Sequence, residues 1–402
     1  MLAPSLSEQL SKRPSAWLFC RVIDNYGDIG VAWRLAGQLA ARGFQVALWH
    51  DHPPSLAALL GNGVADGNIR VHLWQDEAED AVAQEYRHAA PALVVETFAC
   101  DLPAAVLAVI REVRPLWLNW EYLSAEDWAE AMHGKPSLQA DGTAKYFWLM
   151  GFSPRSGGLL READYVQRRQ VFLSQAAAQA TLRQQLGLPE SPVAATRRWL
   201  CFGYAGDIWA LWLAAWQAWG QPLECWLAGS QIIDSLRAAG AIPAQALRQD
   251  GDVWQAGNVR LVRIAFVPQR DFDGILHLAD GVVVRGEDSF VRAQLAGKPM
   301  LWHIYPQEEM AHAVKLHAFW QQYYRQTGTA PWADAHRRLS DEINGVAALD
   351  APARAAAWAT LLDNWPAWQQ AATDWQQYLL AQSDTISRLL AAWPHWVQER
   401  RE

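Results

Sequence analysis

The sequence predicts an α/β protein made of two doubly wound, Rossmann-like domains, and three observations predict this fold. Short apolar runs alternate with segments of helical periodicity through the first half of the chain. The same alternation starts again near residue 199, and the last part of the chain is almost entirely helical. Such alternation is typical of parallel sheets whose two faces are buried by crossover helices.

The composition is that of a globular protein larger than one ordinary domain. The chain has 402 residues, of which 51% are hydrophobic and 19% are charged. Because the net charge is -8 and no basic stripe is present, we expect no nucleic-acid partner. We find no C-x-x-C pair, no signal segment and no apolar run long enough to span a bilayer. We therefore expect no zinc site, no membrane contact and a cytoplasmic location.

The first half of the chain contains six short apolar runs that we expect to form one sheet. They span residues 16–23, 45–50, 69–74, 92–96, 115–120 and 145–150. A helix over 31–41 follows the first run, and another at about 173–186 closes this half. Residues 187–198 are rich in Gly, Pro and Ser and indicate a linker. The predicted N-terminal domain is therefore residues 1–186.

The second half repeats this organisation without a detectable sequence repeat. Its expected strands span residues 199–204, 223–228, 259–266, 281–284 and 299–304. We place the second domain at 199–365 and a set of C-terminal helices at 366–402, crossing back to the N-terminal domain. This arrangement resembles the GT-B fold of glycosyltransferases, in which the carboxyl ends of two sheets face each other across a cleft.

The loop after the first strand does not match a dinucleotide-binding turn. It has only Gly27 and Gly30, whereas a nicotinamide or flavin enzyme would carry G-x-G-x-x-G there. Two carboxylates, Asp24 and Asp28, occupy this loop instead, and anionic side chains are a poor cradle for phosphate. One interpretation is that both aspartates only structure the turn; the other is that they bind a cationic group.

Residues 281–316 are the most informative part of the second half. A strand is followed by a Gly-containing turn and a helix that begins near Glu287. Ser289, Arg285 and the free amides of that helix end form a predicted diphosphate site. Alternatively, Glu287 and Asp288 only cap the helix. The helix that follows opens with a pattern typical of nucleotide-sugar sites, filled here by Pro306, Glu309 and His312.

Three further features each have two interpretations. Asp271 and Asp273 match the D-x-D of metal-dependent transferases, but they lie at a predicted helix start, which favours capping. Phe202 and Tyr204 alternate, so they point to one face, either for core packing or for stacking on a base. The 24 tryptophans include several at helical spacing, for which helix packing is favoured over a ligand site.

Six long and unusual segments resemble the bacterial elongation factor P maturation arginine rhamnosyltransferases, and the match runs nearly from end to end. The segments are FCRVIDNYGDIGVAWRLA (19–36), VVETFACDLP (94–103), LNWEYLSAEDW (118–128), GFSPRSGGLLRE (151–162), FVPQRDFD (266–273) and VRGEDSFVRAQLAGKP (284–299).

The resemblance implies a GT-B enzyme that transfers rhamnose from TDP-β-L-rhamnose to one arginine of elongation factor P, with inversion and without a metal or other cofactor. By resemblance, the catalytic acids are Asp24, Asp28 and Glu287. The thymine and ribose contacts fall on Phe202, Tyr204, Gln269 and Phe272. The diphosphate contacts fall on Arg285, Asp288 and Ser289.

An arginine acceptor would explain why two aspartates lie in this loop. A guanidinium is a planar cation whose donors match carboxylate geometry. It is also a poor nucleophile that a carboxylate cannot deprotonate beforehand, so the proton must leave as the C–N bond forms. We expect Asp28 to be the base and Asp24 to orient the acceptor. The alternatives are a non-catalytic adaptor that binds elongation factor P, or a GT-B transferase using another nucleotide sugar.

Overall fold

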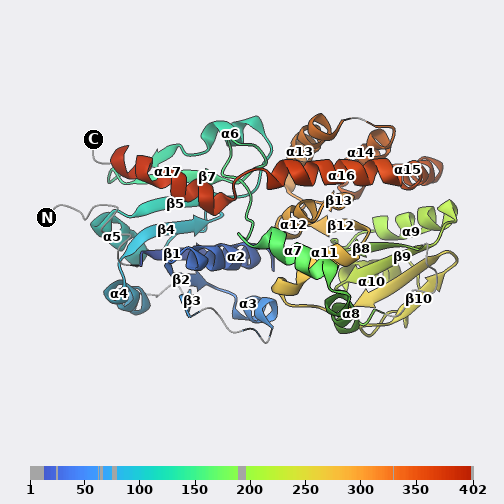
Figure 1. Ribbon diagram of the computed structural model, residues 1–402, viewed down its shortest axis with the longest axis horizontal. Coiled ribbons are helices and arrows are strands. Elements are labelled where there is room, and N and C mark those ends of the chain that lie inside the picture. The colour runs from blue at the N-terminus through green and yellow to red at the C-terminus, as the bar shows by residue number, and fades with distance from the viewer. Residues whose placement is uncertain are drawn as a thin grey trace. The chain divides into compact units, whose positions relative to one another are not determined.

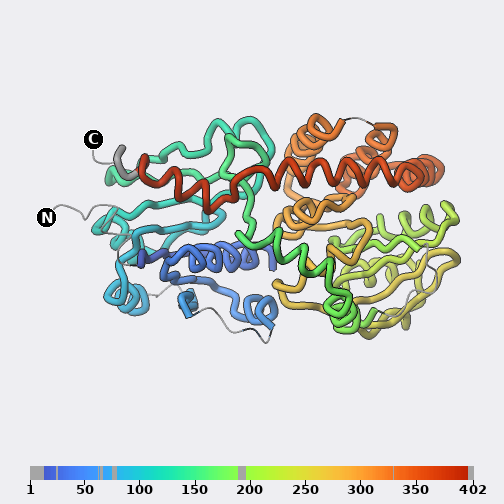
Figure 2. The backbone as a smooth tube through the Cα atoms, viewed as in Figure 1, coloured from blue at the N-terminus to red at the C-terminus, as the bar shows by residue number. Residues whose placement is uncertain are grey.

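The protein has two compact α/β units, seen in a computed structural model (Figure 1). The first unit comprises Met1–Tyr165 with Gln382–Glu402, and the second comprises Val166–Ala381. Figure 2 traces the chain through these two changes of unit. The structure describes residues 13–23, 26–61, 63, 67–74, 79–188, 196–328 and 330–399.

The first unit is built on a seven-stranded sheet with the order β3-β2-β1-β4-β5-β7-β6. All neighbouring strands are parallel except the edge pair β6 and β7. The strands are β1 (Ser15–Cys20), β2 (Gln45–His50), β3 (Ile69–Leu73), β4 (Pro91–Thr97), β5 (Leu116–Glu121), β6 (Pro136–Leu138) and β7 (Ala144–Leu149). The helices are α2 (Gly27–Ala41), α3 (Pro53–Leu60), α4 (Glu79–His88), α5 (Ala104–Val113), α6 (Asp127–Met132) and α17 (Thr385–Glu399).

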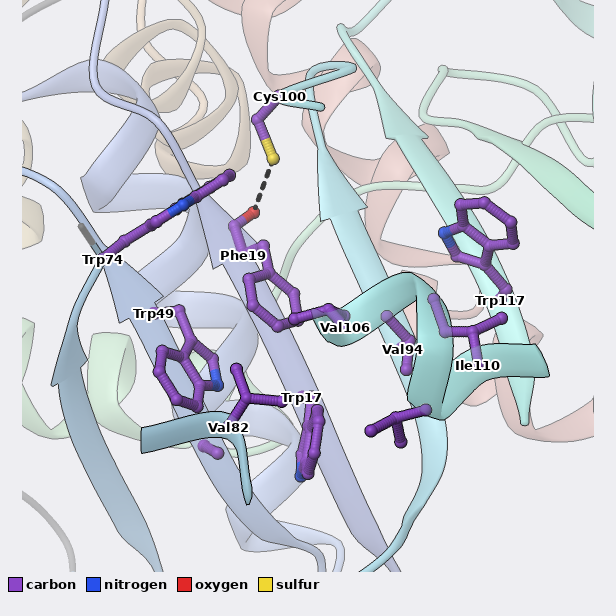
Figure 3. Packing of buried hydrophobic residues seen from close by; sticks show 12 residues of the cluster. Trp17, Phe19, Trp49, Trp74, Val82, Val94, Cys100, Val106, Ile110 and Trp117 are labelled. Carbon is purple, nitrogen blue, oxygen red and sulfur yellow. Dashed lines mark hydrogen bonds between the residues drawn. The ribbon is translucent and has the colours of Figure 1, made fainter. Parts of the chain in front are cut away.

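Aromatic side chains fill one face of this sheet (Figure 3). Trp17 and Phe19 point the same way because side chains alternate along β1, and both are fully buried. Phe19 pairs in register with Trp49 of β2, and their rings stack with centroids 5.7 Å apart. Val106 and Ile110 of α5 complete this cluster. The packing fixes the carboxyl end of β1, from which the aspartate loop starts.

The second unit is built on a six-stranded sheet with the order β10-β11-β9-β8-β12-β13, in which only the edge strand β10 is antiparallel. The strands are β8 (Arg197–Cys201), β9 (Leu223–Ala228), β10 (Val253–Ala256), β11 (Val259–Ile264), β12 (Gly281–Arg285) and β13 (Met300–His303). The α-helices are α7 (Tyr165–Ser174), α8 (Ala176–Gln185), α9 (Ile208–Trp219), α10 (Gln231–Ala238), α11 (Phe272–Leu278), α12 (Asp288–Ala296), α13 (Ala311–Thr327), α14 (Trp332–Ile343), α15 (Ala351–Asp363) and α16 (Trp365–Leu380). Two short 3-10 turns are η1 (Gln269–Asp271) and η2 (Glu308–Met310).

Tryptophans join the helices of this unit to its sheet. Trp199 of β8 contacts Trp358 of α15 and Trp368 of α16, with ring centroids 5.6 and 5.7 Å apart. All three side chains are almost completely buried. The prediction that such tryptophans serve helix packing is therefore confirmed for this cluster.

The boundaries of the two units differ from the predicted ones. Helices α7 and α8 lie within the predicted first domain but belong to the second unit: the ring of Phe172 contacts His277 on α11. The helix predicted at about 173–186 corresponds to α8, and α7 was not expected. Helix α16, predicted in the tail, also belongs to that unit, because the Trp375 indole donates to Gln294 on α12 at 2.8 Å. Helix α17 packs on the first sheet, and most of the predicted linker lies outside the described residues.

Two edge strands, β6 and β10, were not expected from the sequence, and α2 starts four residues before the predicted helix. Across the part of the chain that the structure describes, no helix has the combination of length and apolar character that a membrane span requires.

Candidate functional site

The predicted base, Asp28, lies in the first turn of α2 and is buried. Its Oδ2 accepts the backbone N–H of Ile23 at 2.8 Å. The neighbouring N–H of Val22 donates to Oδ1 of Asp51 at 2.9 Å, so two carboxylates hold the residues that follow β1. The other predicted acid of this loop, Asp24, lies outside the described residues.

Two thiols lie near Asp28 at this edge of the sheet, and neither is a nucleophile. Burial raises the pKa of the Cys20 thiol well above its ordinary value, and the nearby charge of Asp28 adds to this effect. Burial also raises the pKa of Cys100 to about 12. Both thiols are therefore protonated near neutral pH.

In the second unit, the seven predicted donor-binding residues gather at the carboxyl edge of the sheet. Strands β8 and β12 are parallel neighbours, so the segments that follow them start at the same edge. The residues come from four segments: Phe202 and Tyr204 follow β8, Arg285 ends β12, Asp288 and Ser289 open α12, and Gln269 and Phe272 lie in η1 and at the start of α11.

Two aromatic residues of this edge contact one cation, and a third ring lies beside them. The guanidinium carbon of Arg285 lies 4.4 Å from the ring centroid of Phe202 and 5.0 Å from that of Tyr204. The ring of Phe272 lies 6.1 Å from that of Phe202 at a tilt of 60°. Phe202 and Tyr204 thus face the same partner, as their alternate positions predict.

Buried neighbours fix the Phe202–Tyr204 segment. The backbone N–H of Tyr204 donates to Nδ1 of His303 at 3.2 Å. Burial lowers the pKa of His303 to about 3, and the charge of Arg285 adds to the effect, so the imidazole is neutral and can accept this bond. Between the two aromatic residues, a Cβ on Gly203 would lie 2.3 Å from the Trp209 ring. Only glycine allows the backbone to approach so closely.

Glu287 stands at the N-cap position of α12, but its side chain makes no capping bond. It pairs instead with Lys315 of α13, with Nζ 2.6 Å from Oε1. The side chain of Asp288 accepts a hydrogen bond from Nε2 of Gln269 at 3.3 Å. Ser289 donates its hydroxyl proton to the carbonyl of Arg285, which ties the start of α12 to the end of β12. A capping bond therefore does not account for Glu287.

The two aspartates of the D-x-D match were expected to cap a helix, but neither interaction that the structure shows for them is a side-chain capping bond. Asp271 occupies the N-cap position of α11 without a side-chain capping bond. Asp273 binds the Nε of Arg292 at 2.7 Å. Within the described ranges, no group of three or more His, Cys, Asp or Glu side chains is arranged to hold a metal ion.

The pattern at the start of α13 has a structural basis. His312 is buried, and its Nδ1 accepts the backbone N–H of Gln307 at 3.1 Å, while Nε2 lies 3.1 Å from the carbonyl of Asn344. Glu309 and Met310 adopt left-handed φ values of 53° and 59°. His312 therefore shapes the turn that leads to Lys315.

The fold and this edge define a class of protein. Solved glycosyltransferases share the two-unit arrangement, including the spinosyn forosaminyltransferase SpnP, with a TM-score of 0.52 and 13% identity over 97% of this chain and all of SpnP. A UDP-bound glycosyltransferase of Siraitia grosvenorii gives a TM-score of 0.51 at 12% identity, over 96% of this chain and all of its own. The protein has the GT-B glycosyltransferase fold.

The sequence family is more specific. The family model for the elongation factor P (EF-P) rhamnosyltransferase EarP matches residues 17–393. A protein-arginine rhamnosyltransferase of Neisseria meningitidis is 51% identical over 93% of this chain and 96% of its own length, and that of Pseudomonas aeruginosa is 38% identical over 95% and 100%. The chain belongs to the EarP family.

A solved structure agrees with this assignment. It is described as the structural basis for EarP-mediated arginine glycosylation of translation elongation factor EF-P, and it is 28% identical with a TM-score of 0.65 over 95% of this chain and 99% of its own. The protein is therefore an enzyme, a protein-arginine rhamnosyltransferase, and the non-catalytic adaptor is excluded.

Three residues that contact the predicted site residues were not themselves predicted from the sequence: His303, Arg292 and Lys315. Arg292 follows Asp288 by four residues on the predicted helix, a spacing that signals an ion pair, and the two side chains lie 3.5 Å apart. Nothing local in the sequence indicates Lys315 or His303, because their partners are 28 and 99 residues away.

Proposed function

We propose that this enzyme transfers L-rhamnose from TDP-β-L-rhamnose to a single arginine side chain of translation elongation factor P, with inversion at the anomeric carbon. The observation that carries the donor half is the gathering of three aromatic rings, Arg285 and the start of α12 at one sheet edge. The acceptor half is supported by the activities of the relatives. Because the proposed acceptor is a translation factor, the enzyme acts in the cytoplasm.

The donor binds along this edge in three parts. Thymine stacks on the aromatic group of Phe202 and Phe272, with Tyr204 and Gln269 toward the ribose. The diphosphate meets Arg285 and the backbone N–H groups of Asp288 and Ser289 in the first turn of α12, all of which favour negative charge.

No metal is required in this proposal, for an electrostatic reason. Arg285 and the positive end of α12 offset the charge of the departing diphosphate. Asp273, the acid that a D-x-D site would need, is held by the guanidinium of Arg292 at 2.7 Å. A second cation at that carboxylate would meet the like charge of Arg292.

Transfer is therefore expected to survive EDTA. Rates with and without chelator should agree within about twofold, because no step depends on a bound cation. Loss of activity with chelator, restored by magnesium or manganese, would contradict the proposal and return Asp271 and Asp273 as ligands. The control is an Asp273→Asn variant, which should show the same insensitivity to EDTA.

The acceptor guanidinium is held by Asp24 and Asp28. One of its nitrogens attacks the anomeric carbon as the bond to the TDP oxygen breaks, and the nitrogen becomes acidic as the C–N bond forms. Asp28 takes that proton. The hydrogen bond from Ile23 orients its carboxylate, with an N–H to Oδ2 distance of 2.8 Å. Attack opposite the leaving group inverts the configuration.

Glu287 acts on the sugar. A carboxylate beside the diphosphate would repel it, so we assign Glu287 to the rhamnose hydroxyls, where a carboxylate oxygen accepts hydrogen bonds. Its pairing with Lys315 gives it a defined direction, and the two side chains are each only 15% exposed.

Intact mass spectrometry of elongation factor P tests the whole proposal. Incubation with the enzyme and TDP-β-L-rhamnose should add one deoxyhexose, and fragmentation should place it on one arginine. Substituting lysine for that arginine should abolish the gain. If UDP- or GDP-sugars support transfer and TDP-rhamnose does not, the donor assignment is wrong. NMR of the linkage decides inversion.

A further inference from the structure

Arg292 is a buried cation near the centre of the donor edge. Its side chain is 5% exposed, and each of its guanidinium nitrogens serves a different partner. Nε binds Oδ1 of Asp273 at 2.7 Å, and Nη2 donates to the backbone carbonyl of Gln269 at 2.8 Å. Nη1 lies 3.5 Å from Oδ2 of Asp288. A guanidinium can serve three directions in one plane, and an ammonium cannot reproduce that geometry.

The partners of Arg292 belong to the proposed donor site. Gln269 is held through its backbone, and its amide in turn donates to Asp288 at 3.3 Å. The guanidinium carbon also lies 5.1 Å from the ring centroid of Phe272, so the cation contacts one face of the ring. One side chain thus sets the positions of three residues assigned to the nucleotide.

Asp273 is the counter-ion of this arrangement. A guanidinium so nearly removed from water needs a close carboxylate, and Asp273, itself 13% exposed, provides it. Asp273 lies on α11 and Arg292 on α12, so the pair fixes the start of α11, with Phe272, against the helix whose first turn faces the diphosphate.

We infer that Arg292, with Asp273 as its counter-ion, is a positioning residue that holds the thymine-side residues Gln269 and Phe272 in register with Asp288 on the diphosphate side. This inference rests on the proposed nucleotide donor. It gives the second acid of the D-x-D match a role without a metal. It also makes nucleotide affinity depend on a side chain that acts through other residues.

The test is calorimetric titration of the full-length enzyme with TDP alone. Arg292→Met should raise the Kd for TDP by about tenfold or more, because three contacts lose their position together. Arg292→Lys should lie between wild type and Arg292→Met, since it keeps the charge but not the three directions. Asp273→Asn should weaken TDP binding less than Arg292→Met. With saturating donor, kcat should change much less than the donor KM.

Arg354 provides a matched control. It is a buried arginine on α15 whose Nε binds Oε1 of Glu342 at 2.9 Å and whose Nη2 donates to a backbone carbonyl, and Glu342 also accepts the indole of Trp212. Arg354→Met should therefore lower the unfolding temperature as Arg292→Met does, yet leave the Kd for TDP unchanged. Equal Kd increases in the two variants would reduce Arg292 to a general structural role.

A double-mutant comparison tests whether Arg292 acts through Phe272. Arg292→Met should weaken TDP binding markedly less in a Phe272→Ala background than in the wild type. If the two substitutions weaken TDP binding additively, Arg292 does not act through Phe272. A folded Arg292→Met variant with the wild-type Kd for TDP would overturn the whole inference. If the wild-type enzyme itself does not bind TDP, the proposed donor is wrong and the inference falls with it.

Discussion

Asp28 combines two tasks in one side chain. It accepts the N–H of Ile23 and so holds the loop after β1, and it is the proposed base. An asparagine can keep the first task, because its amide oxygen also accepts a hydrogen bond, but it cannot take a proton. The two interpretations of this residue, structural and chemical, are therefore separable by substitution.

Asp28→Asn should lower the single-turnover rate by about 100-fold or more, the usual contribution of a general base. The Kd for TDP should stay within about twofold, because the change is on the acceptor side. Asp28→Ala serves as the comparison, since it also loses the bond to Ile23 and should destabilise the first unit. A rate for Asp28→Asn within tenfold of wild type would show that another group takes the proton.

Substitutions of Lys315 should likewise separate two effects, one on the transfer rate and one on TDP affinity. Lys315→Met should remove the ion pair with Glu287, and we expect transfer to slow by about tenfold, or about 1.4 kcal/mol, while Lys315→Arg restores most of it. TDP affinity should be unchanged, because the pair is proposed to face the sugar. Rapid-quench measurements with both variants decide this, and a failure of arginine to rescue would mean that Lys315 contributes more than charge.

At the scale of the element, the segment after β8 depends on a neutral histidine. His303 accepts the N–H of Tyr204, and burial lowers its pKa from 6.5 to about 3. The unfolded chain therefore binds a proton more readily than the native protein between these values. Stability from this group is complete above about pH 6.5 and is lost as the pH falls toward 3.

Chemical unfolding as a function of pH checks this. In His303→Asn, whose side-chain oxygen can accept the same N–H, the loss of unfolding free energy between pH 6 and 4 should be smaller by about 1.4 kcal/mol per pH unit. Two other histidines, His277 and His336, still make the unfolding free energy of the variant fall in acid, because burial lowers the pKa of each to about 4. An identical pH profile in the variant would mean that His303 is protonated in the native protein.

The parallel strands of both sheets could be predicted from the sequence, and the two antiparallel edge strands could not. Buried parallel strands appear as continuous apolar runs, and β9 was located to the residue. The antiparallel edge strands β6 and β10 have mostly exposed residues and no such run. Helix α7 was not expected, and the predicted domain boundary placed α8 with the first sheet, because the contact between Phe172 and His277 crosses about a hundred residues of sequence.

The residues predicted to bind the donor lie at one sheet edge, and their binding role stays a prediction, but the side chains that hold them in place were not predicted. Motifs retain the groups expected to touch a nucleotide, such as Arg285 and Ser289. Lys315 and His303 act through contacts that only the folded chain creates, and both lie outside those motifs. The catalytic roles of Asp24, Asp28 and Glu287 stay predictions, whereas a capping bond, the simplest interpretation of Glu287, does not describe its side chain.

At the scale of the whole molecule, the first unit is discontinuous in sequence. Its C-terminal helix α17 contributes the buried side chains Ile386, Leu389 and Trp393. Thr385 Oγ1 accepts the indole N–H of Trp148 at 2.8 Å, and α17 lies beside β5 and β7 (Figure 1). Three buried side chains contribute on the order of 5 kcal/mol, which is comparable to the net stability of a domain.

A chain that ends at residue 381 should therefore lose the fold of its first unit, although the deletion lies more than 200 residues from it in sequence. Hydrogen exchange resolved by peptide should show loss of protection in β1, β4 and β5 and retained protection in β9 and β12. A chain ending at 399 is the control. Unchanged protection of the first sheet would show that α17 is dispensable.

Because the first unit is discontinuous in sequence, the order of synthesis affects which unit can finish folding first. On the ribosome, residues 13–165 emerge before residues 166–381, yet their sheet lacks the helix that contacts Trp148 until residues 385–399 are made. The continuous second unit, residues 166–381, has all of its own sequence earlier. The usual N-terminal-first order of domain folding is thus reversed at the last step. The unit with the proposed acceptor acids is completed after the unit with the proposed donor site, so a partly synthesised enzyme would hold the donor site before it could modify a protein.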